Sequence, residues 1–149
     1  MNSQPVEVAI AILYRQNQLL MQLRDNIPGI LYPGFWGLFG GHIEPGETPE
    51  EALKRELLEE INYTVPEASF FGHYPEPHVF RHVFAVPLTV ELNQLELHEG
   101  WDMGLLSLEQ IQKGECYSEK AGQVRPLGPA HQRILLDFLR SRELVMGDG

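Results

Sequence analysis

Residues 40–63 read GGHIEPGETPEEALKRELLEEINY, and the interpretation of the whole chain starts from this stretch. Two glycines precede a helix start. Thr48 can accept a hydrogen bond at the N-cap position, a proline follows it, and Glu51 completes a capping box. The helix is therefore predicted to run to about Ile61, with Asn62 in the left-handed conformation that often follows a helix.

The acidic residues of this helix stand against local preference. At about 100° per residue, Glu56, Glu59 and Glu60 share one face. Like charges at this spacing cost roughly 0.2–0.5 kcal/mol per pair, and Glu59 and Glu60 also lie at the negative end of the helix dipole. The neighbouring face is an apolar stripe that is predicted to pack on a core. It comprises Leu53, Leu57, Leu58 and Ile61.

Hard divalent cations explain why three carboxylates stand together. Mg²⁺ and Mn²⁺ prefer carboxylate oxygens and take phosphate oxygens as further ligands. A solvated acidic face is the alternative from the helix alone. The preceding glycines favour the metal, because the carbonyl of Gly40 could approach an ion closely where no Cβ intervenes. An ordinary tight turn is the alternative interpretation of the glycines.

The stretch resembles the Nudix box, G-x5-E-x7-R-E-U-x-E-E-x-G-U, where U is an aliphatic residue. Gly41, Glu47 and Arg55 stand at the matching spacings, as do the three acids of the helix. Asn62 replaces the usual glycine and Tyr63 replaces an aliphatic residue, and both departures lie at the helix exit. The box covers about a sixth of the chain.

The resemblance to the Nudix (MutT-like) family implies a fold and an activity. The expected fold is an α/β/α sandwich with a mixed sheet between helices, over a single domain of residues 1–149. The expected reaction is Mg²⁺-dependent (or Mn²⁺-dependent) hydrolysis of a diphosphate bond in a nucleoside diphosphate linked to another group. An oxidised dGTP or other nucleoside triphosphate, ADP-ribose, and a nucleotide sugar are all candidate substrates.

The same resemblance implies roles for individual residues. The expected metal ligands are Gly40, through its carbonyl, with Glu56, Glu59, Glu60 and Glu99. Glu47 is expected to hold a ligand-bound water or to orient the helix, and Arg55 to pin a carboxylate in a bidentate pair. Glu99 is the best match for a further loop acid of the family, and Glu96 is second. The general base stays open among Glu56, Glu99 and Glu96.

Composition limits the class of protein. The chain has 149 residues and a formal net charge of −10, which argues against binding nucleic-acid polymers but not against a small phosphorylated nucleotide. No signal peptide and no apolar run near 18 residues are found, so a cytoplasmic location without membrane contact is expected. The oligomeric state is left open, a homodimer included.

The remaining pattern predicts the order of elements. Strands are expected over residues 6–14, 19–24, 35–39, 64–71, 79–90 and 101–106, and helices from Ser107 and from Pro129. Residues 25–34 are expected to form a loop, residues 73–77 to break a strand, and residues 113–128 to be irregular. The apolar stripe of the last helix comprises Ile134, Leu135, Phe138 and Leu139.

Other residues admit more than one interpretation. Tyr32, Phe35, Trp36 and Phe80 could stack on a base, although aromatic residues in strands are more often core. The roles of His42, His78, His82 and Arg81 are left open between packing and substrate contact. A catalytically silent nucleotide-sensing module is one alternative function. Isomerase chemistry is another, and it would require Cys116 to be reactive and close to Glu56.

Overall fold

The computed structural model describes residues 4–30 and 32–147, with side chains described through residue 142. The chain divides into two compact units. The first unit holds Met1–Arg15 and Leu38–His98, and the second holds Gln16–Gly37 and Glu99–Gly149. Each unit is described by itself.

The sheet of the first unit is mixed. β1 (Val6–Arg15) runs parallel to β6 (Val79–Pro87) and antiparallel to β4 (Phe39–His42), and β5 (Ser69–Pro75) pairs antiparallel with β6. β1 is buried from Val8 to Leu13, on both of its faces. The strand predicted over residues 6–14 is therefore confirmed, and it lies between two neighbouring strands.

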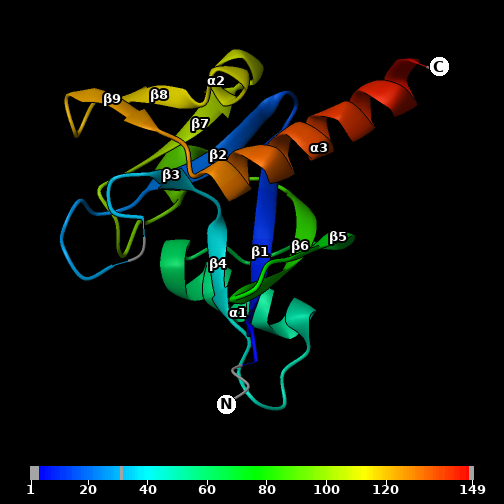
Figure 1. Cartoon of the computed structure of the whole chain (residues 1–149). Coiled ribbons are helices and arrows are strands. Elements are labelled where there is room, and N and C mark those ends of the chain that lie inside the picture. The colour runs from blue at the N-terminus through cyan, green and yellow to red at the C-terminus, as the bar shows by residue number, and fades with distance from the viewer. Residues whose placement is uncertain (1–3, 31, 148–149) are drawn as a thin grey trace. The chain divides into compact units, whose positions relative to one another are not determined.

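Helix α1 (Pro49–Ile61) begins and ends as its sequence predicts. The Thr48 hydroxyl accepts from the backbone N–H of Glu51, the Glu51 carboxylate accepts from the N–H of Thr48, and Asn62 follows the helix with φ of 56°. Figure 1 draws α1 beside β4 and β1, the strands that it contacts.

The predicted apolar stripe of α1 is wrong at one position. Leu53, Leu57 and Ile61 are buried, but Leu58 is 49% exposed, and Ala52 is buried in its place. The helical period explains the difference, because a residue five positions after Leu53 lies about 140° away from it around the helix axis. The same geometry brings Glu60 into the buried arc, where its Oε2 atom is shielded from solvent.

Two strand boundaries in the first unit differ from the prediction. β5 begins at Ser69 rather than Thr64 and extends through Pro75, so residues 73–75 belong to the strand that they were expected to break. His73 pairs with His82 across the ladder, and a register shift between Phe70 and Gly72 absorbs the irregularity. β6 ends at Pro87, and a short 3-10 helix, η1 (Leu92–Gln94), follows it.

The second unit has its own strands. β2 (Gln18–Leu23) pairs antiparallel with β3 (Trp36–Gly37) and with β7 (Asp102–Ser107). The strand predicted over residues 35–39 is therefore two short strands, β3 in this unit and β4 in the first. Trp36 is buried, and its indole N–H donates to the carbonyl of Cys116 at 3.1 Å.

The end of the second unit contains more structure than predicted. α2 (Leu108–Lys113) follows Ser107 as predicted, starts with a capping box between Ser107 and Gln110, and stops at Gly114, whose φ is 81°. Residues predicted to be irregular then form the hairpin of β8 (Glu115–Ser118) and β9 (Gln123–Pro126), drawn yellow to orange in Figure 1. α3 (Pro129–Gly147) buries Ile134, Leu135 and Phe138 of its predicted stripe, whereas Leu139 is only partly buried. Among the described residues, no helix is long and apolar enough to cross a membrane.

Candidate active site

Arg55 is the centre of the candidate site, which lies along α1 in the first unit. Its Nε and Nη2 atoms donate to the two carboxylate oxygens of Glu47, at 2.7 and 3.0 Å, which is a bidentate pair. Nη1 donates to Glu56 at 2.9 Å and reaches Glu59 at 3.3 Å, and Nη2 also donates to the carbonyl of His42 at 3.0 Å. One guanidinium therefore links the glycine loop to the acids of the helix.

Hydrogen bonds within this cluster shift the pKa values of Glu47 and Arg55. Hydrogen bonding to Arg55 lowers the pKa of Glu47 from 4.5 to about 2, and the backbone N–H of Glu44, which donates at 2.9 Å, acts in the same direction. The pKa of Arg55 is raised above its ordinary value, chiefly by its hydrogen bonds to Glu47. Glu47 is thus an anion that orients the arginine.

Gly41 makes room for Glu56. A Cβ on Gly41 would lie 2.4 Å from the carboxyl carbon of Glu56 and within 2.7 Å of both its oxygens. Gly40 is required for a different reason, because its Cβ would lie 2.1 Å from the carbonyl oxygen of Ala9 on β1. The first glycine lets β4 pair with β1, and the second leaves a space that the Glu56 carboxylate fills.

The three helix acids differ in exposure. The side chain of Glu56 is 17% exposed and that of Glu59 is 60% exposed, while one oxygen of Glu60 is shielded from solvent. Within residues 4–30 and 32–142, no three His, Cys, Asp or Glu side chains converge closely enough to hold a metal ion. In this arrangement Glu56 and Glu59 both lie toward the Arg55 guanidinium.

The two loop acids fall in different units. Glu96 lies in the first unit, with its carboxylate 3.3 Å from the ring of His98. Glu99 lies in the second unit, beside a cavity of about 140 Å³. Gln22, Arg24, Asp25, Ile27, Ile30, Glu99 and Gly100 line this cavity. The Nε atom of Arg24 is shielded from solvent and has no hydrogen-bond partner among the described residues. The assignment of Glu99 to the metal set stays a prediction.

Several residues with open roles have structural partners. His82 contacts Glu7 at 2.8 Å, and Arg81 is buried in an ion pair with Glu76. His78 is exposed, and its carbonyl accepts from the N–H of Val6. The side chains of His82 and Arg81 therefore have acidic partners, whereas among the described residues His78 is held by its backbone alone.

The aromatic residues that could stack on a base lie in different environments. Trp36 belongs to the core of the second unit, while Tyr32 and Phe35 pack edge to face at 5.7 Å in the loop before β3. Phe80 contacts the rings of His73 and His82 on the first-unit sheet. The buried position of Trp36 removes it from the candidates for stacking on a base.

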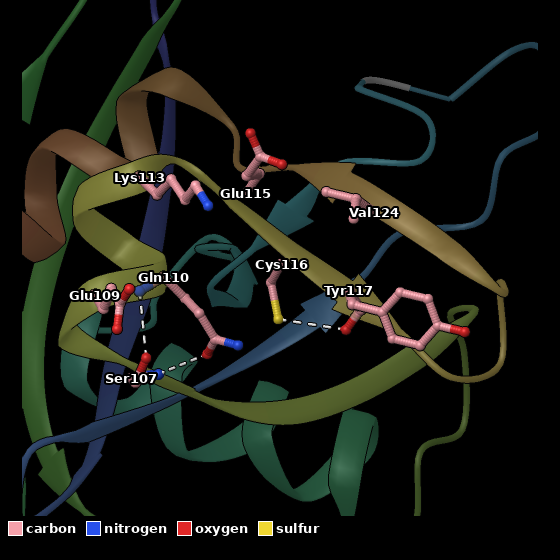
Figure 2. A pocket seen from close by; sticks show the side chains of 8 residues that line it. All are labelled: Ser107, Glu109, Gln110, Lys113, Glu115, Cys116, Tyr117 and Val124. Atoms are coloured by element: carbon pink, nitrogen blue, oxygen red, sulfur yellow. Dashed lines mark hydrogen bonds between the residues drawn. The ribbon is translucent and has the colours of Figure 1, made fainter.

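Cys116 is not an activated thiol. It is buried in the second unit, and burial together with the charge of Asp102 raises its pKa. A reactive cysteine needs the opposite shift, toward the thiolate. The thiol lines a cavity of about 300 Å³ together with Lys113, Glu115 and Tyr117, and Figure 2 shows these side chains between α2 and the β8–β9 hairpin. None of the box residues lines that cavity.

The fold and the site define an α/β protein with an arginine-anchored, glutamate-rich helix behind a glycine loop. Residues 4–126 match the family model of the NUDIX domain. The chain therefore belongs to the Nudix hydrolase family, and the predicted α/β fold with a mixed sheet is confirmed. A MutT protein from Methanosarcina mazei has the same fold, with a TM-score of 0.72 and 19% identity over 96% of this chain and 99% of that one.

Two relatives extend the comparison. An ADP-ribose pyrophosphatase from Methanocaldococcus jannaschii is 28% identical over 138 residues, which are 91% of this chain and 74% of that protein. A Bacillus subtilis protein provisionally named an 8-oxo-dGTP diphosphatase is 35% identical over 68 residues, 46% of this chain. That match spans 42% of the Bacillus subtilis protein, less than half of its length.

Sequence reasoning missed two features of the site. Arg24 ends a predicted strand, and no motif indicates that it lines a cavity together with Glu99. His98 contacts the end of α1 across 39 positions of sequence. The clue available for His98 was the absence of any basic residue in the last turn of α1.

Proposed function

We propose that this chain hydrolyses a diphosphate bond in a nucleoside diphosphate linked to another group, using Mg²⁺ or Mn²⁺. The observation that carries the proposal is the Arg55 cluster, which holds Glu47, Glu56 and Glu59 around one guanidinium in a chain of the Nudix family. Nudix hydrolases generally use divalent metal ions.

The donor set fits a hard cation in its chemistry. Glu56, Glu59, Glu60 and the carbonyl of Gly40 would hold the ion, since all are oxygen donors of the kind that Mg²⁺ and Mn²⁺ prefer. The space that Gly41 leaves for the Glu56 carboxylate supports this assignment. When bound, the ion would neutralise phosphate charge and lower the pKa of an attacking water.

The chain's own groups orient and balance this site. Arg55 fixes Glu56 against the glycine loop, and Glu47 in turn fixes Arg55 through the bidentate pair. Glu56, Glu96 and Glu99 remain the candidates for the base that accepts a proton from water. Their carboxylates are the groups that such a step needs near neutral pH.

The substrate is proposed to be a small nucleotide rather than a polymer. The names of the relatives, an ADP-ribose pyrophosphatase and a provisional 8-oxo-dGTP diphosphatase, support this class. We treat residues 1–149 as one domain of this type.

The test is a substrate panel. The purified chain is incubated with nucleoside triphosphates including an oxidised dGTP, with ADP-ribose and with nucleotide sugars, in Mg²⁺, in Mn²⁺ or in a chelator, and the products are separated. The expected result is cleavage between phosphates of one class, abolished by the chelator. Nucleotide binding without any cleavage would instead support a silent sensing module, and cleavage that survives the chelator would contradict the metal.

A further inference from the structure

The last turn of α1 leaves its carbonyl groups in need of donors, as every helix end does. The N–H groups of Asn62 and Tyr63 donate to the carbonyls of Leu58 and Leu57, at 3.0 and 3.2 Å. The carbonyls of residues 59–61 remain beyond the reach of this local cap. They belong to the turn that carries two of the proposed metal ligands.

A distant segment supplies the missing donors. The N–H of His98 donates to the carbonyl of Glu60 at 3.0 Å, and the N–H of Glu96 donates to the carbonyl of Ile61 at 3.2 Å. The Nδ1 atom of the His98 ring bonds to the carbonyl of Glu59. Residues 96–98, called the strap here, therefore occupy all three remaining carbonyls.

The strap also places a histidine at the C-terminal end of α1, which has no basic residue of its own. The last turn of α1 has no basic residue, although a positive charge is favourable at a helix C-terminus. His98 occupies that position, and its ring is held on the other side by Glu96 at 3.3 Å.

We propose that the strap positions the metal-binding end of α1, with His98 as its positioning residue. The inference rests on the proposed function, because it concerns the same acids. Bonds to the carbonyls of Glu59 and Glu60 fix the backbone from which both carboxylates project. Helix ends otherwise fray. A small displacement of the groups that act on a substrate can greatly reduce activity.

The strap has a second consequence through chain connectivity. Glu99 is the next residue after His98, and consecutive Cα atoms lie about 3.8 Å apart. Anchoring His98 on α1 therefore restricts where Glu99 can go.

The experiment measures Mn²⁺ affinity by calorimetry, without substrate, for wild type, His98→Ala and His98→Gln. His98→Ala is expected to weaken Mn²⁺ binding by about 10-fold, the effect typical of groups that hold metal ligands in place. His98→Gln retains a side-chain N–H donor and is expected to restore most of the affinity. His73→Ala, which removes an exposed histidine of the same unit, is the matched control and should bind Mn²⁺ as wild type does.

Further readouts separate positioning from simple loss of stability. The melting temperature of His98→Ala should change little, although its Mn²⁺ affinity falls. Hydrogen exchange at the amides of residues 59–61 should accelerate in the same variant. If His98→Ala does not fold, Glu96→Gln takes its place, because it removes a charged partner of the His98 ring and leaves the ring present. Glu96→Gln is expected to bind Mn²⁺ more weakly than wild type, by less than about 10-fold.

The outcomes distinguish the two proposals. Wild-type affinity in a folded His98→Ala variant, or in Glu96→Gln where that variant is the one that folds, would overturn the role of the strap and leave the proposed function standing. Failure of the wild-type chain to bind Mn²⁺ would overturn the metal site itself, and the role of the strap with it. Equal losses in His98→Ala and His98→Gln would contradict the donor role of the ring.

Discussion

The two ends of α1 are stabilised in opposite ways. At the N-terminal end, Thr48 and Glu51 cap each other within three residues, and acids in the first turn suit the positive end of the dipole. At the C-terminal end, Glu59 and Glu60 oppose the dipole, and three of the carbonyls accept from the strap, which lies up to 39 positions away. The first end stabilises itself, whereas the second depends on the rest of its unit.

The difference teaches where function lies on the helix. The N-terminal end follows local rules in every residue that contributes to it. The C-terminal end keeps unfavourable charges, lacks a basic residue, and needs the strap to complete its hydrogen bonds. Departure from local preference that is repaired from a distance is typical of a functional site.

The largest effect is expected from removing charge at the C-terminal end. Glu59→Gln and Glu60→Gln should each reduce turnover by orders of magnitude, while thermal stability stays equal or rises because repulsion and the unfavourable dipole contact are relieved. Glu50→Gln is the control at the N-terminal end, where the acid is paired with Lys54 at 3.1 Å. Steady-state kinetics decide the matter, and full activity in both C-terminal variants would refute the metal assignment.

The next effect is a loss of stability at the buried face of α1, which runs along the whole helix. Leu57→Ala should lower the free energy of unfolding by about 2–5 kcal/mol, because Leu57 is fully buried. Leu58→Ala, one position along, should change it by no more than about 0.5 kcal/mol, since that side chain is half exposed. Urea denaturation measures both. Similar losses in the two variants would contradict the corrected stripe.

A smaller effect is expected at the N-terminal cap. Thr48→Ala removes the acceptor for the N–H of Glu51 and should cost about 0.5–2 kcal/mol of stability. Thr48→Ser keeps the hydroxyl and serves as the control. Because this end only stabilises the helix, turnover per folded molecule should be unchanged, and a selective loss of turnover in Thr48→Ala would show that the two ends are not separate.

The last prediction uses acid to weaken the arginine contact near the N-terminal end. The folded pKa of Glu47 is about 2, below its ordinary 4.5, so its contribution to stability is present above pH 4.5 and is lost as the pH falls toward 2. The difference in unfolding free energy between wild type and Glu47→Gln should shrink over that range. A difference that stays constant from pH 5 to about pH 2 would contradict the Arg55 pairing.

Local pattern was sufficient for the features that depend on neighbours. The capping box at Thr48, the left-handed Asn62 and the burial of Leu53 and Leu57 all follow from the helix alone. Leu58 was misassigned because a hydrophobic residue is not buried unless its angle on the helix allows it. The error therefore lies in the period and not in the tertiary context.

Long-range partners were not predictable in this way. The hydroxyl of Tyr63 donates to the carbonyl of Pro87 at 2.6 Å and lies 3.1 Å from the hydroxyl of Thr89, which explains why a tyrosine is accommodated at the helix exit. The missing basic residue in the last turn of α1 shows that a partner is needed, but neither the identity of His98 nor that of Pro87 and Thr89 follows from spacing, because the fold alone brings these partners together.

The position of the tryptophans has a practical consequence. Both tryptophans of the chain, Trp36 and Trp101, belong to the second unit, while α1 and its acids belong to the first. Intrinsic emission excited selectively from indole therefore reports the melting of one unit and is blind to the other. Far-ultraviolet circular dichroism reports the secondary structure of both units. A difference in midpoint between the fluorescence and the dichroism melting curves would therefore show, without a label, that the units melt independently.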